Sequence, residues 1–233
     1  MSMRFLEKIL KRKRLAEVPE EGTVSESFFL RMMLPQAMKY AAPYEREEER
    51  VLKKVLSSLE NLENFNTVVI GAGPLFYLNL FYHRVKSYTA IEPLSQMFIQ
   101  KQFQFLVKQF KDIHIVSKRF HEVDKTNLQN GNQIFVFIFN IFSYLHDPFK
   151  DLNKLVKPGD VIVLSTWTYT DRAKKIRKKY FDYLNKGEGD IVIDGNSERA
   201  LVRFERFPFK KIKHYKNHTR ITGKVTDFLI IYT

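Results

Sequence analysis

The chain has 233 residues, of which 44% are hydrophobic, no cysteine, and a formal net charge of +13. This length and composition predict one folded unit and exclude wholesale disorder. The absence of cysteine excludes disulfides, thiolate metal ligands and cysteine nucleophiles. The positive charge is compatible with a nucleic-acid partner. The chain is also rich in Phe, Ile, Tyr and Asn, so a general compositional bias is the favoured explanation of the charge.

The apolar runs are too short to cross a membrane. A spanning helix needs about 20 apolar residues. The best candidate, residues 134–145, has twelve and includes Asn140 and Ser143. The N-terminus shows no apolar region typical of a signal peptide. We therefore expect a soluble, cytoplasmic protein without a membrane span.

The first 60 residues are predicted to be helical. Apolar residues recur at helical spacing after Glu45: Val51, Leu52, Val55, Leu56 and Leu59. Pro35 and Pro43 are expected to interrupt the segment before that helix. The predicted organisation is a helical cap at residues 1–60 and a main domain at residues 61–233 that form one compact unit.

From residue 66 onward, predicted strands alternate with predicted helices. The apolar runs that predict strands are 67–70, 88–91, 113–116, 134–139 and 161–164. The helix-like segments between them are 74–82, 95–110 and 148–155. This alternation predicts an α/β fold with a doubly wound, mostly parallel sheet. The run 134–139 is apolar throughout, which is typical of a central strand buried on both faces.

The pattern changes after residue 165. A basic helix is predicted at 171–184. Short strand-like segments follow at 190–194, 199–206, 211–216 and 225–232. A turn at 222–224 favours a hairpin. The sheet is therefore expected to end in an antiparallel strand or hairpin.

The first strand leads directly into Gly71-Ala72-Gly73. Glycines allow the backbone to turn sharply and to approach a ligand closely. Glu92 lies 21 residues after Gly71, at the end of the second strand, where an acid can accept hydrogen bonds from ribose hydroxyls. Position 76 is Phe, so the third glycine of the dinucleotide fingerprint is absent. These features predict an adenosine-type cofactor and disfavour a nicotinamide dinucleotide.

Four segments together resemble the class I S-adenosylmethionine-dependent methyltransferase family. They are 68–73 (VVIGAG), 90–93 (AIEP), 139–148 (FNIFSYLHDP) and 155–163 (LVKPGDVIV). The resemblance covers about residues 66 to 166. It implies a Rossmann-like fold and S-adenosylmethionine as the cofactor.

The resemblance also implies roles for individual residues. Gly71, Ala72 and Gly73 would face the methionine part of the cofactor. Glu92 would hold the ribose hydroxyls, and Pro93 would border the adenosine.

Two further positions follow from the resemblance. Asn140 would sit beside the sulfonium end, where many members of the family have an acid. The family usually has another acid after the third strand, whereas this chain has Ser117-Lys118-Arg119-Phe120. Phe120 is expected to pack on the adenine instead, and Glu122 is an alternative acceptor for its amine.

The reactive methyl group needs mainly an aligned nucleophile, and a base helps only when the acceptor arrives protonated. Tyr144 and His146 follow the fourth strand at the ligand-binding edge and are the candidate catalytic residues. A surface position is the competing interpretation for His146. Asp147 before Pro148 is predicted to cap a helix. Four aromatic residues are candidates for an acceptor pocket, with core packing as the alternative: Tyr40, Tyr44, Trp167 and Tyr169.

The predicted function is methyl transfer to a small-molecule acceptor without a metal. One alternative is aminocarboxypropyl transfer from the same cofactor, because residues 71–75 are similar to a segment of nicotianamine-synthase-like enzymes. The other is a non-catalytic RNA-binding protein on the same fold, which the basic clusters 8–14, 172–179 and 210–216 favour.

Overall fold

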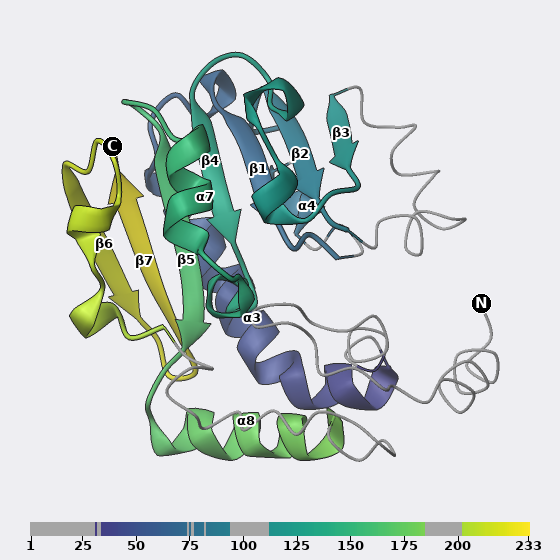
Figure 1. The fold of residues 1–233 in the computed structure, drawn as a ribbon. Coiled ribbons are helices and arrows are strands. Elements are labelled where there is room, and N and C mark those ends of the chain that lie inside the picture. Colours follow the sequence, from purple (N-terminus) through teal and green to yellow (C-terminus); the bar gives the residue numbers. More distant parts are fainter. Residues whose placement is uncertain are drawn as a thin grey trace.

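The computed structural model describes residues 31, 34–73, 75, 77–81, 83–93, 112–184 and 202–233. In this part of the chain, seven strands form one sheet with helices on both faces (Figure 1). The strands are β1 (Asn66–Ile70), β2 (Ser87–Ile91), β3 (Ile113–Val116), β4 (Gln133–Phe137), β5 (Val161–Trp167), β6 (Asn217–Thr222) and β7 (Thr226–Tyr232).

The strand order is β3-β2-β1-β4-β5-β7-β6. Strands β1 to β5 are parallel, whereas β7 pairs antiparallel with both β5 and β6. The predicted doubly wound, mostly parallel sheet with an antiparallel C-terminal hairpin is confirmed, and β4 lies at its centre as expected. The strand order reverses between β1 and β4. Open α/β sheets bind ligands at the carboxyl ends of the strands beside such a switch point.

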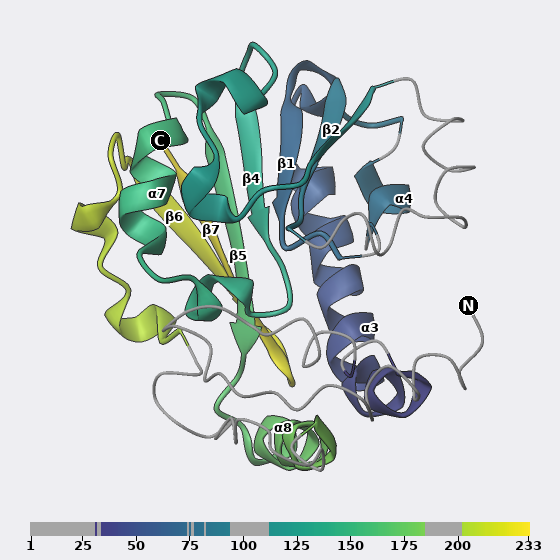
Figure 2. The same cartoon turned by 45° about the vertical axis from the view of Figure 1, so that its right-hand side comes forward.

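The described helices include α3 (Pro35–Ser58), α4 (Leu78–Phe81), α7 (Pro148–Leu155) and α8 (Asp171–Leu184). Helices α3 and α4 cover one face of the sheet, and α7 covers the other (Figures 1 and 2). Helix α8 lies beyond the carboxyl ends of the parallel strands and packs on the N-terminal half of α3. None of the helices that the structure describes is long and apolar enough to span a membrane.

Neighbouring residues of β1 enter opposite layers of the core. Val69 joins the apolar cluster under α3 and α4, which includes Leu52 and Phe81. Val68 and Ile70 join the cluster under α7. Side chains alternate along a strand, so a strand with helices on both faces is apolar throughout. Each such side chain contributes about 1.5–3 kcal/mol when fully buried.

Helix α3 is longer than the sequence predicted. The predicted helix began at Glu45, but α3 begins at Pro35 and continues through Pro43. Proline suits the first turn of a helix, whereas an internal proline costs about 3 kcal/mol because it removes a backbone hydrogen bond. Ala41 and Tyr44, close to Pro43, are buried in a cluster with residues of α8. This packing offsets the cost of the internal proline.

The predicted helix at 74–82 is reduced to α4. Leu75 and Tyr77 adopt left-handed backbone conformations, with φ of 61° and 59°, which no regular α-helix contains. The chain therefore makes an irregular turn between β1 and α4.

The predicted strand at 211–216 is wrong. A 3₁₀ turn at Phe209–Lys211 includes only its first residue, and the strand β6 begins after it, at Asn217. The side chain of Asn153 in α7 satisfies the backbone here, because its Nδ2 donates to the Lys211 carbonyl at 2.6 Å and its Oδ1 accepts from Lys213 N–H at 2.9 Å. These groups therefore need no partner strand.

Part of the predicted helical cap forms α3, and its residues 1–30 lie outside the described residues. The predicted helix 95–110 and the predicted strand 190–194 lie outside them as well. Of the predicted strand 199–206, the described residues include a 3₁₀ turn at Phe204–Arg206.

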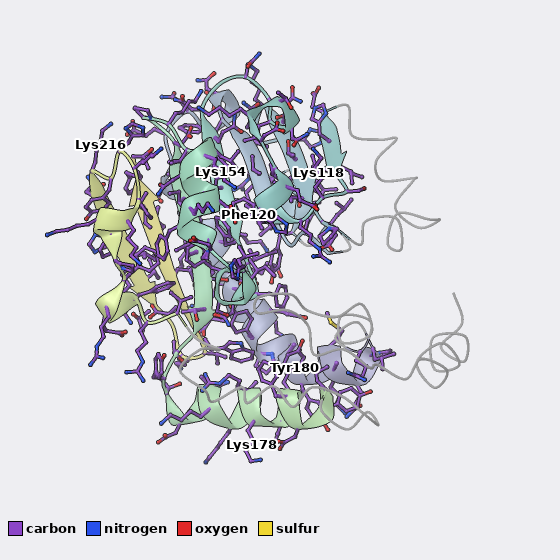
Figure 3. All side chains as sticks on the ribbon, viewed as in Figure 1. Lys118, Phe120, Lys154, Lys178, Tyr180 and Lys216 are labelled. Atoms are coloured by element: carbon purple, nitrogen blue, oxygen red, sulfur yellow. The ribbon has the colours of Figure 1, made fainter. Side chains whose placement is uncertain are left out.

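The basic residues of α8 lie on its outer side except Arg177, which is buried. Figure 3 shows Lys178 on the side away from the sheet and Tyr180 on the side that faces it. Tyr180 is 6% exposed, and its ring centroid lies 6.5 Å from that of Trp167. Much of the positive charge of the basic cluster 172–179 thus lies on a helix face that is exposed to solvent.

Glu47 fastens α3 to the turn between β6 and β7. Its carboxylate accepts hydrogen bonds from the backbone N–H groups of Lys224, Val225 and Thr226 at 2.9, 2.5 and 2.8 Å. Burial raises the pKa of Glu47, but these donors outweigh burial and hold its pKa below the usual range. The carboxylate therefore stabilises the fold in its ionised form.

Replacing Glu47 with Ala is expected to lower the free energy of unfolding at pH 7 by about 1–3 kcal/mol, because three N–H donors lose their acceptor. The loss should shrink as the pH falls below the usual range of a carboxyl group, where Glu47 becomes protonated. Urea denaturation from pH 3 to pH 7 measures both effects. Glu49→Ala, which removes an exposed ion pair with Lys53, should cost less than about 1 kcal/mol. Equal losses in the two variants would contradict the assignment.

Candidate functional site

Two turns meet at the switch point of the sheet. β1 ends at Ile70 and β4 ends at Phe137, and these two residues are partners in the register. Gly71 follows with φ of +66°. A Cβ atom at Gly71 would lie 2.8 Å from Cγ1 of Ile141, in the turn after β4. Only glycine allows both this backbone conformation and this close approach.

Glu92 closes the glycine turn against the end of β2. It is only 4% exposed, and its Oε2 accepts a hydrogen bond from Gly73 N–H at 2.9 Å. The N–H of Gly71 donates to the Ile91 carbonyl at 2.9 Å. The structure thus brings together three of the predicted cofactor residues, Gly71, Gly73 and Glu92, and Ala72 is buried between the glycines.

The other two predicted adenosine contacts differ in exposure. Pro93 is exposed directly after Glu92. Phe120 is 4% exposed and packs edge-on against Phe137, with the ring centroids 5.4 Å apart. Figure 3 shows Phe120 on the α7 side of the sheet. Its contact with an adenine remains a prediction. Glu122, the alternative, accepts from the backbone N–H of Arg119 at 2.7 Å.

Asn140 holds the turn after β4 in place. It is fully buried, with φ of 58°. Its Nδ2 donates to Ser143 Oγ at 2.7 Å, and its Oδ1 accepts from Thr166 Oγ1 of β5 at 2.6 Å. These hydrogen bonds fix the turn next to the glycine turn. A direct role beside the sulfonium remains a prediction.

The candidate catalytic residues lie between this turn and α7. The structure describes only the backbone of Tyr144, and His146 is exposed. Asp147 caps α7 as predicted, with its side chain accepting from Lys150 N–H at 3.2 Å. The catalytic roles of Tyr144 and His146 remain predictions.

Tyr44 and Trp167 are part of the core and do not line an open acceptor pocket. They are 0% and 5% exposed, and their ring centroids lie 4.2 Å apart. Tyr40 and Tyr169 are partly buried against the same cluster. Packing between α3 and α8 thus accounts for these aromatic residues.

A surface pocket of about 440 Å³ lies beside the turn after β4. Ser143, the partner of Asn140, lines it together with Phe149, Phe207 and two arginines, Arg203 and Arg206. It combines aromatic surface with positive charge. Among the described residues, no group of three or more histidine or acidic side chains is arranged to hold a metal ion.

Glu48 of α3, which was not among the predicted site residues, is fully buried beside these turns. Its Oε1 accepts from Phe139 N–H at 2.9 Å, and its Oε2 accepts from the Tyr77 hydroxyl at 3.0 Å. The hydroxyl of Ser165 in β5 also donates to Oε1. Glu48 lies four residues after Tyr44 and four before Leu52, on the apolar face of the helix. An acid on the apolar face of a predicted helix is the sequence feature that could have indicated a buried, functional carboxyl group.

Burial raises the pKa of Glu48 to about 7, although its hydrogen-bond donors act in the opposite direction. A buried carboxylate is costly unless it is hydrogen bonded. The raised pKa means that the folded state binds this proton more tightly than the unfolded state does.

No family model matches the sequence, and no curated protein matches it. Solved structures do. N-methyltransferase NodS from Bradyrhizobium japonicum WM9, in complex with S-adenosyl-L-homocysteine, matches with a TM-score of 0.52 at 13% identity over 91% of this chain and 98% of that chain. The chain has the class I S-adenosylmethionine-dependent methyltransferase fold. The predicted Rossmann-like fold is therefore confirmed.

Two further solved structures match with a TM-score of 0.55. The CurJ carbon methyltransferase is 14% identical over 87% of this chain and 60% of that chain. The citrinin polyketide synthase CMeT domain is 16% identical over 91% of this chain and 59% of that chain.

Replacing Gly71 with Ala is expected to lower the free energy of unfolding by about 1–3 kcal/mol, because alanine is strained at positive φ and its methyl group meets Ile141. Thermal unfolding measures the change. In an Ile141→Ala background the same replacement should cost less, since the steric contact is gone and only the backbone strain remains. An equal cost in both backgrounds would exclude the contact.

The stability of Glu48→Gln relative to the wild type is expected to depend on pH. Because the folded-state pKa of Glu48 is raised, its contribution to stability is present below the unfolded pKa and is lost as the pH rises through about 7. Between pH 5 and pH 8, the difference in free energy of unfolding should shift in favour of the variant by about 2 kcal/mol. Urea denaturation across this range measures it, and a constant difference would contradict the raised pKa.

Proposed function

We propose that the protein binds S-adenosylmethionine and transfers its methyl group to a small-molecule acceptor. The observation that carries this proposal is the buried carboxylate of Glu92 at the end of β2, hydrogen bonded to Gly73 N–H in the turn after β1. The carboxylate suits the two ribose hydroxyls of an adenosyl group. The glycine turn offers backbone where a side chain would not fit.

The residues of the site would share the work of binding. Glu92 would orient the ribose, and the backbone of Gly71 to Gly73 would lie along the methionine part. Asn140, fixed by Ser143 and Thr166, keeps the turn after β4 next to the glycine turn. The cofactor, when bound, supplies an electrophilic methyl group. Alignment of the acceptor is then the main catalytic task.

The pocket beside Ser143 is the proposed binding site of the acceptor. Aromatic rings with Arg203 and Arg206 favour a partly apolar molecule that carries an anionic group. His146 and Tyr144, next in sequence to the pocket residues Leu145 and Ser143, are the proposed groups to take a proton from an acceptor that arrives protonated. The similar structures include both an N-methyltransferase and a carbon methyltransferase, so they do not indicate which acceptor atom is methylated.

The lack of cysteine suits a reducing compartment such as the cytoplasm.

S-adenosylhomocysteine is expected to bind the wild type, and Glu92→Ala should weaken binding by about 5- to 150-fold, because a buried acceptor worth about 1–3 kcal/mol is removed. Isothermal titration calorimetry measures both affinities. Glu63→Ala makes the same charge change at an exposed residue just before β1 and should bind like the wild type. NAD should not bind. No binding of an adenosyl ligand, together with salt-sensitive RNA binding, would favour the RNA-binding alternative.

The product then distinguishes the two transfers. Methyl transfer from S-adenosylmethionine leaves S-adenosylhomocysteine, whereas aminocarboxypropyl transfer leaves methylthioadenosine. Mass spectrometry of turnover mixtures containing candidate anionic acceptors separates the two products.

A further inference from the structure

Unfavourable backbone conformations are concentrated in the two turns at the switch point. Of the seven non-glycine residues with positive φ in the described part of the chain, four lie there. Leu75 and Tyr77 follow β1, and Phe139 and Asn140 follow β4. Left-handed backbone is costly for large side chains, and such residues cluster where a function requires them. Another group must therefore hold these turns.

Glu48 contacts one unfavourable residue in each turn. Its two carboxylate oxygens accept from Tyr77 Oη and from the backbone N–H of Phe139, at 3.0 and 2.9 Å. The rings of Tyr77 and Phe139 stack with their centroids 6.2 Å apart and an angle of 7° between the planes. Tyr44 donates to Ser165 Oγ at 3.2 Å, and the Ser165 hydroxyl donates to Glu48. One carboxyl group of α3 thus connects both turns to β5.

We propose that Glu48 is a positioning residue whose ionised carboxylate holds the two turns in the arrangement that binds the adenosyl group. This inference rests on the proposed function. All three partners donate to the carboxyl group, which suits its ionised form. A protonated carboxyl must give one oxygen a hydrogen, so it cannot serve all three donors in the same way. Protonation therefore weakens the hydrogen bonds between the carboxyl group and the two turns, although it removes the cost of burying the charge.

Three other titratable groups act in this region. Glu45, one turn earlier on α3, has its pKa raised to about 7 by burial, with the Arg46 charge lowering it. Burial, followed by the charge of Glu48, raises the pKa of Tyr77 above its usual range, so Tyr77 remains a donor. Tyr44 donates to Ser165. Glu45 and Glu48 titrate in the same range and must be separated by individual substitutions.

The test is calorimetric titration of S-adenosylhomocysteine at pH 6, 7 and 8 into the full chain. With a pKa of about 7, the ionised fraction of Glu48 rises from about one tenth to about nine tenths, so the wild-type affinity should rise about tenfold. Glu48→Gln should bind weakly with no rise. Glu45→Gln and the control Glu49→Gln, at a partly exposed residue, should keep the rise.

A second variant decides the matter if Glu48→Gln does not fold. Tyr77→Phe removes one donor to the carboxylate, which makes ionisation harder. The midpoint of the pH dependence of binding should therefore move to higher pH, which loss of packing alone would not produce.

The outcomes separate the two proposals. Binding of S-adenosylhomocysteine with the same pH dependence in the wild type and Glu48→Gln overturns the role of Glu48 and leaves the proposed function standing. An unmoved midpoint in Tyr77→Phe does the same. No binding by the wild type at any pH overturns the proposed function itself and, with it, this inference.

Discussion

The parallel pairing of β1 with β4 is the constraint on which the site depends. Since Ile70 and Phe137 are register partners, the turns that follow them must leave the sheet side by side. Each turn then needs its own anchor. Glu92 holds the glycine turn to the end of β2, and Asn140 holds the other turn to β5 through Thr166. The sheet thus places the two turns, and buried polar side chains from its neighbouring strands determine their shape.

Much of this arrangement was predictable because it is local or periodic. The strand 113–116 and the helices 148–155 and 171–184 have the bounds that the sequence predicts. The spacing of their apolar residues indicates directly which side chains are buried. Asp147 before Pro148 indicates the start of a helix, because the Asp147 side chain accepts a hydrogen bond from Lys150 N–H. The glycines after the first apolar run and Glu92 after the second likewise predict two parts of the same cofactor site. Such signals need no knowledge of distant residues.

The features that the sequence did not reveal depend on distant partners. Pro43 is an interruption by local rules, but packing of α3 on α8 carries the helix through it. The segment 211–216 has the residues of a strand, yet Asn153 of α7 pairs with the Lys211 carbonyl and the Lys213 N–H. Glu48 is an acid on an apolar helix face, and its three donors come from segments 29 to 117 residues away. In each case the deciding group is far away in the sequence.

Glu48 also shows why such a group would persist. An apolar residue on this face of α3 would avoid the cost of burying a carboxylate, and buried polar groups are often less stabilising than apolar ones of similar size. An apolar residue would, however, leave the N–H of Phe139 and the hydroxyl of Tyr77 without this acceptor. Both residues have left-handed backbone conformations, which regular helices and strands do not contain and therefore do not stabilise. The free energy lost at Glu48 is therefore best understood as the cost of holding two unfavourable turns at the switch point of the sheet.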